Sequence, residues 1–101
     1  MVENWDNVIK MVKYSKAGIL SKELTKNSKQ NLTLFCMAAN TKMSEHTSTK
    51  GGFVFVLEGK GIFNLEGEDI PMAKGTLIYL RKNAKHSLKV EKNTAFLLSL
   101  C

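Results

Sequence analysis

The stretch that decides the fold reads His46-Thr47-Ser48-Thr49-Lys50-Gly51-Gly52-Phe53-Val54-Phe55-Val56-Leu57-Glu58-Gly59-Lys60-Gly61. Its centre, residues 53–57, is the most β-prone run in the chain, because it holds only aromatic, β-branched and leucine side chains. The two glycines in residues 58–61 predict a tight turn. Since every side chain of residues 53–57 is apolar, the run is typical of a strand that is covered on both faces.

Shorter apolar runs recur outward from this strand, and polar turn residues separate them. We expect strands over residues 19–24, 32–37, 62–65, 76–80, 88–90 and 95–100, with turns at 27–31, 66–69 and 92–93. Such regular spacing predicts an all-β sandwich or closed barrel of about seven or eight strands.

The first 17 residues have a different pattern. Trp5, Val8, Ile9 and Val12 have helical spacing, which predicts a short helix or an irregular arm. This arm is expected to cover one end of the barrel or to pack on a partner subunit. The sequence thus divides into an arm, residues 1–17, and a barrel, residues 18–101, within a single domain.

Composition excludes several classes of function. The chain has 101 residues and a net charge of +6. Arg81 is the sole arginine, whereas nucleic-acid readers rely on arginine, so we expect no nucleic-acid partner. No signal peptide or membrane-spanning run is visible, which favours a cytoplasmic protein with reduced thiols and no membrane partner. Cys36 fits no metal or redox spacing with Cys101 and is expected in the interior.

Two motifs resemble those of the cupin family, and in particular small single-domain bacterial cupins of the RmlC-like jelly-roll type. The first is the stretch from His46 through Val56-Leu57-Glu58-Gly59, and the second runs from Gly75 to His86. The resemblance extends over about residues 18–100. It implies a cupin-type jelly-roll β-barrel with His46 and His86 facing its interior, and, by the parity of Gly52, Val54 and Val56 facing inward as well.

The family's metal site usually has three histidines and one glutamate. By the resemblance, His46 matches the first histidine and His86 the last, while Ser48 and Gly52 occupy the other two ligand positions. Two imidazoles alone make a weak site, so we expect a degenerate metal site and no cofactor. The alternative is a weakly bound Zn, Ni, Mn or Fe ion on His46 and His86.

A barrel without that metal still has an interior that could hold a ligand. The expected pocket residues are His46, Ser48, Gly52, Val54, Tyr79, His86 and Cys36. The leading hypothesis is a non-catalytic protein that binds a small organic molecule there. Two alternatives stay open: a metal-dependent enzyme of dioxygenase or isomerase type, and a dimeric structural or regulatory module.

Residues 53–57 and 95–100 hold more apolar side chains than one barrel interior needs. If Val54 and Val56 face inward, then Phe53 and Phe55 face a second layer or another subunit. A chain this small also gains from association, because its own core is thin. The sequence therefore predicts a homodimer.

Overall fold

Antiparallel strands make up most of the chain, which confirms the all-β prediction. The structure is a computed structural model that describes residues 4–27 and 29–101. A 3₁₀ helix, η1 (Val8–Met11), precedes the strands. The described strands are β1 (Ile19–Lys26), β2 (Asn31–Met37), β3 (Lys42–His46), β4 (Gly52–Glu58), β5 (Gly61–Leu65), β6 (Glu68–Met72), β7 (Leu77–Leu80), β8 (His86–Val90) and β9 (Thr94–Leu100).

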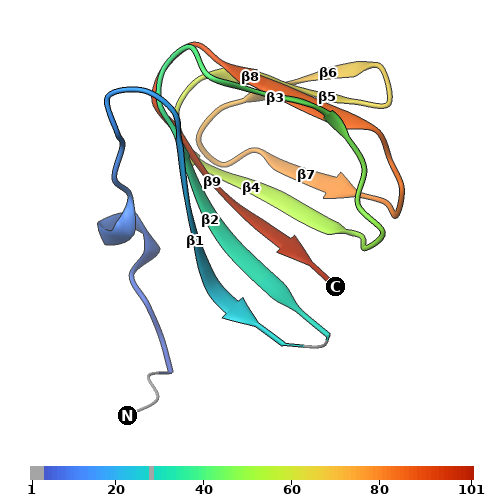
Figure 1. Cartoon of the computed structure of the whole chain (residues 1–101), viewed down its shortest axis with the longest axis horizontal. Helices are drawn as coiled ribbons and strands as arrows, with labels where there is room; N and C mark the ends of the chain where they lie inside the picture. The colour runs from blue at the N-terminus through green and yellow to red at the C-terminus, as the bar shows by residue number, and fades with distance from the viewer. Residues whose placement is uncertain (1–3, 28) are drawn as a thin grey trace.

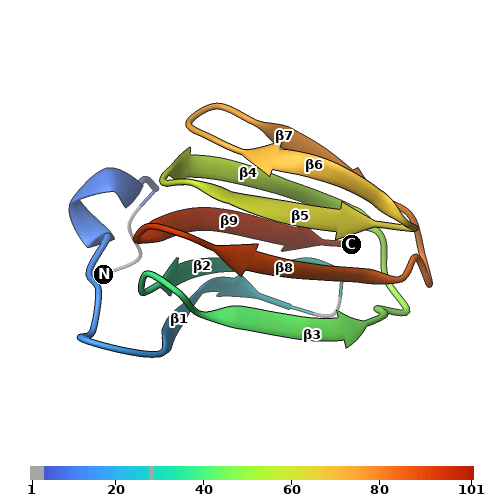
Figure 2. The ribbon, with the colours of Figure 1, turned by 90° about the horizontal axis from the view of Figure 1, so that it is seen from above.

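The strands form two sheets that face each other as a jelly-roll barrel (Figures 1 and 2). The first sheet has five strands in the order β1-β2-β9-β4-β7, and the second has four in the order β3-β8-β5-β6. Consecutive strands often lie in different sheets, for example β2 and β3, or β8 and β9. Residues that are far apart in sequence therefore meet between the sheets.

Two of the nine described strands, β3 and β6, were not predicted from the sequence. In β3 only Met43 is apolar among Lys42–His46, so the strand shows no hydrophobic alternation. In β6, acidic residues and Pro71 interrupt the apolar alternation that marks a strand. The predicted turn at residues 66–69 also includes Glu68 and Asp69, which are the first two residues of β6. Proline is tolerated because β6 is the last strand of its sheet, where an amide N–H need not pair.

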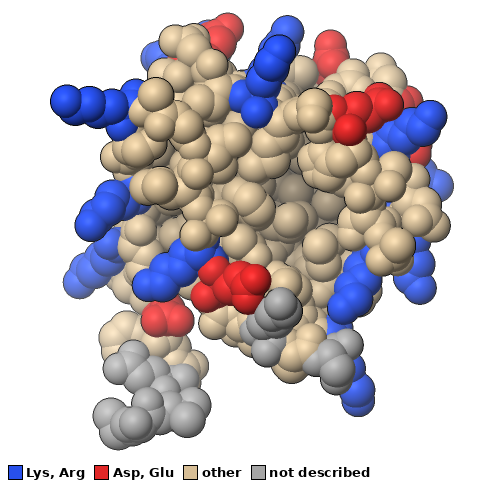
Figure 3. All heavy atoms as spheres, viewed as in Figure 1, with Lys and Arg blue, Asp and Glu red and all other residues tan. Residues whose placement is uncertain are grey.

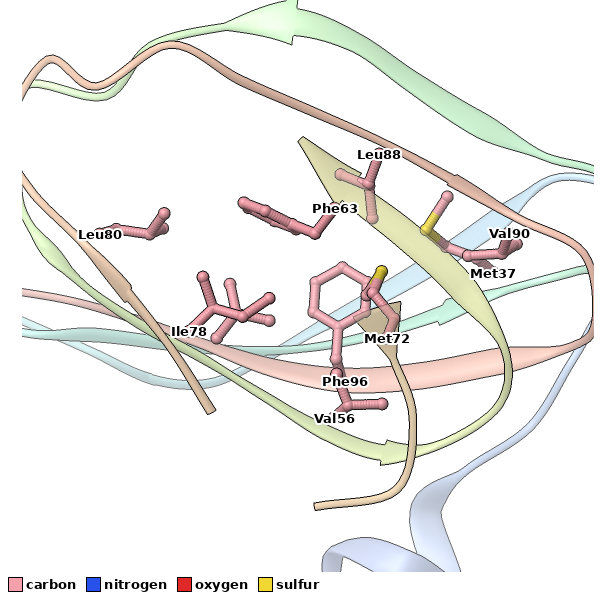
Figure 4. Close-up of a cluster of buried hydrophobic side chains, with 10 residues drawn as sticks. Met37, Val56, Phe63, Met72, Ile78, Leu80, Leu88, Val90 and Phe96 are labelled. Atoms are coloured by element: carbon pink, nitrogen blue, oxygen red, sulfur yellow. The ribbon is translucent and has the colours of Figure 1, made fainter. Parts of the chain in front are cut away.

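The core lies between the sheets, and β4 shows how the sequence builds it. Val54 and Val56 are buried in the core, while Leu57 packs on the outer side of the sheet, as their alternation predicts. We call the buried residues between the sheets the interior cluster. It comprises Met37, Val54, Val56, Phe63, Met72, Ile78, Leu80, Leu88, Val90 and Phe96, most of which are labelled in Figure 4.

The described part of the N-terminal segment, from residue 4, forms an arm that packs on the outside of the barrel. Val8, Met11, Val12 and Tyr14 pack against a second cluster, Leu34, Cys36 and Ala95, on the outer face of the five-stranded sheet. The Tyr14 hydroxyl donates a hydrogen bond of 2.8 Å to Glu58. Burial and this carboxylate raise the pKa of Tyr14. No helix in residues 4–27 or 29–101 has the length and apolar character to cross a membrane.

Candidate functional site

His46 and His86 lie directly opposite each other on the neighbouring strands β3 and β8. Their ring centroids are 4.2 Å apart, and the rings meet edge to face at 66°. A bulge in β3 between Met43 and His46 shifts the register and brings His46 into line with His86. His86 is buried, 7% exposed, and stacks on Phe63 of the interior cluster at 5.6 Å.

Backbone carbonyl groups fix the proton positions on both rings. Nδ1 of His46 lies 2.7 Å from the carbonyl oxygen of Ser44, and Nδ1 of His86 lies 2.9 Å from that of Ala84. A carbonyl oxygen only accepts, so each Nδ1 donates its hydrogen. In the neutral form of each ring, Nε2 is then left as a hydrogen-bond acceptor.

Burial keeps His86 in the neutral form. Desolvation lowers the pKa of His86, the neighbouring His46 lowers it further, and the hydrogen bond to Ala84 opposes the shift only in part. An imidazolium at this position would lose its hydration and would face a second ring that can also take a proton. The His86 Nε2 atom is therefore an acceptor at neutral pH.

The lowered pKa of His86 predicts that acid destabilises the fold. The unfolded chain binds a proton at this ring at about pH 6.5, whereas the folded chain does so only at lower pH. The stability that the neutral His86 ring gives the fold is fully present above about pH 6.5. It is lost as the pH falls through this value toward the pKa of His86 in the folded chain. Urea unfolding between neutral pH and about pH 5 should show this loss of unfolding free energy.

The matched control is His86→Asn, whose side-chain amide can still donate to the Ala84 carbonyl but does not titrate. In this variant the decline of stability over the same pH range should be smaller. An equal decline in both proteins would mean that a group other than His86 is responsible.

Apolar side chains lie next to His86 and over the interior cluster beyond it. Leu65 of β5 lies directly opposite His86, while Phe35 of β2 and Leu98 of β9 reach the interior cluster from the facing sheet. All three are half-buried. The space-filling view shows that the surface is hollowed between the two sheets, and lysines lie around the periphery of this face (Figure 3). His86 thus provides polar atoms within mainly apolar surroundings, whereas His46 beside it is exposed.

Three of the other predicted pocket residues have structural roles in the barrel. Val54 is fully buried in the interior cluster, so it forms part of the packed core. Ser48 lies in the β3–β4 loop, where its hydroxyl accepts the amide N–H of Lys50 at 3.2 Å. A side chain on Gly52 would run into the backbone of Ser99, so this glycine permits the close approach of β4 and β9.

The structure corrects the prediction that Cys36 and Tyr79 line the pocket between the sheets, although Cys36 is buried in a hydrophobic cluster, as expected. Cys36 belongs to the outer cluster beneath the arm, and Tyr79 is 75% exposed on the outer face of β7. In both strands the adjacent residue, Met37 or Ile78, occupies the interior. Because side chains alternate along a strand, Cys36 and Tyr79 must then face outward.

The side chains present do not fit the four-ligand metal set that the resemblance implies. In the part of the chain that the structure describes, no three His, Cys, Asp or Glu side chains gather in a metal-binding group. Ser48 is engaged with its own loop, and the backbone of Ser99 occupies the space where a Gly52 side chain would begin. The two Nε2 atoms alone remain as nitrogen ligands.

Sequence reasoning missed Phe63 and Leu65 as neighbours of His86. Their alternation in residues 62–65 is a signal, because Phe63 and Leu65 share one face of the strand. What the sequence does not show is that β5 pairs with β8, with Leu65 in register with His86. That pairing makes Phe63 the ring on which His86 stacks.

The profile of the Cupin_2 family, described as a cupin domain, matches residues 33–101. No curated protein sequence matches the chain. Among solved structures, a conserved protein of unknown function from Streptococcus pyogenes is similar at 19% identity, with a TM-score of 0.88, over 99% of this chain and 88% of that one.

Two longer proteins contain a similar fold. A cupin 2 conserved barrel domain protein from Leptotrichia buccalis is 26% identical, with a TM-score of 0.88, over 94% of this chain and 46% of its own. Salicylate 1,2-dioxygenase from Pseudoaminobacter salicylatoxidans is 16% identical, with a TM-score of 0.76, over 82% of this chain and 26% of its own.

Proposed function

The chain belongs to the cupin domain family, and from this membership we propose that it binds a small organic molecule in the hollow between its sheets. His46 and His86 would hold the ligand through their Nε2 atoms. The observation that carries the proposal is the paired rings, whose Nδ1 atoms are both bonded to backbone carbonyls.

The chemistry of the site favours a neutral ligand that has an apolar body and one or two O–H or N–H donors. Leu65, Phe35 and Leu98 offer apolar contact, and the interior cluster contains only apolar side chains. The lowered pKa of His86 leaves an acceptor and no cation at neutral pH, so an anionic group gains no ion pair with it. Few polar atoms in an apolar wall are typical of small-molecule sites.

Binding is favoured over catalysis for two reasons. Metal chemistry of the dioxygenase kind would need a ligand set that Ser48 and Gly52 do not supply. A histidine acting as a general base is usually oriented by a carboxylate, which also stabilises the charged ring. Here the backbone carbonyls of Ser44 and Ala84 orient the rings instead. They fix the direction of Nε2 but supply no charge.

A pair of probes tests the proposal. 2-Naphthol has an apolar body and one hydroxyl donor, and 2-methoxynaphthalene has the same body without the donor. We expect 2-naphthol to bind about tenfold more tightly, which corresponds to one hydrogen bond of about 1.4 kcal/mol. Titrations followed by amide NMR shifts should show the changes around His86, Leu65 and Phe35.

Variants separate this site from the rest of the surface. The double variant His46→Ala/His86→Asn should reduce the preference for 2-naphthol toward unity, because it removes both Nε2 atoms to which the single hydroxyl can donate. Tyr79→Phe removes a hydroxyl from the outer face and should leave the preference unchanged. Equal binding of the two probes by the unmodified protein, or shifts confined to other surfaces, would refute the proposal.

A further inference from the structure

Strands β3 and β8 carry a second pair of like side chains at the end opposite the two histidines. Lys42 lies directly opposite Lys89, and Lys89 lies directly opposite Ile62 of β5. The neighbours of these three residues along each strand include side chains of the interior cluster or packed against it. Alternation therefore turns Lys42, Lys89 and Ile62 to the outer face of the four-stranded sheet, where Figure 2 shows β3, β8 and β5 side by side.

The two ammonium groups of this pair repel each other. Directly opposed residues on antiparallel strands have Cβ atoms about 4.5–5.5 Å apart, and like charges at such positions weaken a sheet. Among the described residues, no carboxylate forms a salt bridge with Lys42 or Lys89. An anion bound to both ammonium groups would replace this repulsion by two attractions.

A surface cavity of about 430 Å³ lies at this end of the strands. Its charged lining residues are Lys42, Lys60, Lys89 and Glu91, and Ile62 adds an apolar side chain. Three lysines and one glutamate give these residues a net charge of +2. Glu91 is already engaged by Lys60, at 3.1 Å, so the charges left for a ligand are those of the Lys42–Lys89 pair.

The backbone holds the walls of this cavity in place. The carbonyl oxygen of Lys60 accepts the amide N–H of Glu91 at 2.9 Å, which ties the β4–β5 turn to the end of β8. Gly61 lets β5 approach β8, since a Cβ there would lie 2.6 Å from the carbonyl oxygen of Lys89. Walls that are ordered before a ligand arrives lower the entropic cost of binding.

A neighbouring hollow on the same outer face has a different charge. It shares Lys42, Ile62 and Lys89 with the cavity, but its other charged lining residues are Glu45 and Asp69. Two lysines and two acidic residues give it no net charge. An anion is therefore attracted to the cavity beside Lys60 and not to the neighbouring hollow.

We infer that this cavity binds a phosphate dianion, either as the free ion or as a phosphomonoester. One phosphate group carries nearly two negative charges at neutral pH and offers three strong acceptor oxygens, so it can accept hydrogen bonds from both ammonium groups at once. A dicarboxylate of equal charge divides that charge between two separate groups. Ile62 favours the monoester, because an apolar organic group can pack on its side chain.

Titrations with phenyl phosphate and with inorganic phosphate, followed by amide NMR shifts, test the inference. Both ions should shift the amides of Gly61, Ile62 and Val90, which line the cavity. Phenyl phosphate should bind severalfold more tightly if a monoester is the ligand, because inorganic phosphate has no apolar group. Equal affinity would assign the site to the free ion. No binding of either ion, or shifts confined to other lysines, would overturn the inference.

A charge-matched pair of variants shows whether the site or the net charge attracts the ion. Lys42→Ala/Lys89→Ala should weaken phenyl phosphate binding by about tenfold, because both ion pairs are lost. Lys50→Ala/Lys74→Ala removes the same charge from exposed lysines that line neither hollow, and should bind as the unmodified protein does. Equal weakening in both variants would mean that only the overall positive charge matters.

The inference is independent of the proposed function, because the cavity lies outside the four-stranded sheet and at the strand ends opposite His46 and His86. Removing Lys42 and Lys89 takes away a repulsive pair, so the double variant should melt no lower than the unmodified protein. It should also keep the preference for 2-naphthol over 2-methoxynaphthalene if that proposal holds. A loss of phosphate binding with this preference intact would locate the two ligands at separate sites.

Discussion

Gly52→Ala is expected to destabilise the fold by about 3 kcal/mol, which lowers the melting temperature by about 12 °C or more. An added Cβ would run into the carbonyl oxygen of Ser99 and would lie 2.7 Å from its carbonyl carbon and 3.1 Å from the Cα of Leu100. All three are backbone atoms of β9, which pairs with β4 along its length. The added Cβ could be accommodated only if β4 and β9 moved apart.

Gly51→Ala is the control for this variant. A Cβ on Gly51 would lie 3.0 Å from the carbonyl oxygen of Leu80, a tight contact that a small shift can relieve. We expect a cost of about 1 kcal/mol, near the lower end for overpacking. Thermal unfolding of both proteins gives the comparison. Similar melting temperatures for the two variants would mean that the close approach of β4 and β9 is not required.

The contact at Gly52 also has a consequence for the site. The resemblance places an acidic metal ligand at this position, yet any side chain must begin at the blocked Cβ. A carboxylate at position 52 therefore demands a different spacing between β4 and β9. The absence of an acidic metal ligand at position 52 therefore follows from the close packing of β4 against β9, and replacing Gly52 alone would not restore the ligand.

Gly59→Ala is the second substitution with a large expected effect, about 3–5 kcal/mol. Gly59 has a φ of +122°, a conformation that costs a residue with a Cβ about 1–3 kcal/mol. The new Cβ would also lie 2.5 Å from the Cα and 2.6 Å from the Cβ of Thr94. Thr94 is completely buried, and its hydroxyl accepts the amide N–H of Lys60 at 3.1 Å. Thr94 therefore has little room to move.

Gly67→Ala distinguishes the cost of the positive φ from the cost of the contact with Thr94. Gly67 also has a positive φ, +88°, but nothing lies within 4 Å of its Cβ position. We expect its alanine variant to lose about 1 kcal/mol, from the backbone conformation alone. Urea unfolding of both variants measures the difference. Equal losses would show that the contact with Thr94 contributes nothing and that backbone strain is the whole effect.

Much of the barrel could be predicted because apolar alternation is a local property. Residues 53–57 correctly predict a strand with Val54 and Val56 inside and Leu57 outside. The same reasoning fails for β3 and β6, whose sequences are too polar to show alternation. Those two strands form because they pair with β8 and β5, and pairing partners are not visible in a single sequence.

The sequence by itself determined that the chain folds as a β-barrel and that His86 lies in its interior, because motif spacing and side-chain alternation are local features. His46, which the sequence also placed inside, is exposed beside His86. The tertiary structure alone decided which residues surround the two rings. Register brings Phe63 and Leu65 to His86, and a bulge in β3 aligns His46 with it. Alternation also places Cys36 and Tyr79 outside, once Met37 and Ile78 are in the core. A shift of one residue reverses the face of every side chain on a strand, so pairing between distant strands, and not the local pattern, determined this site.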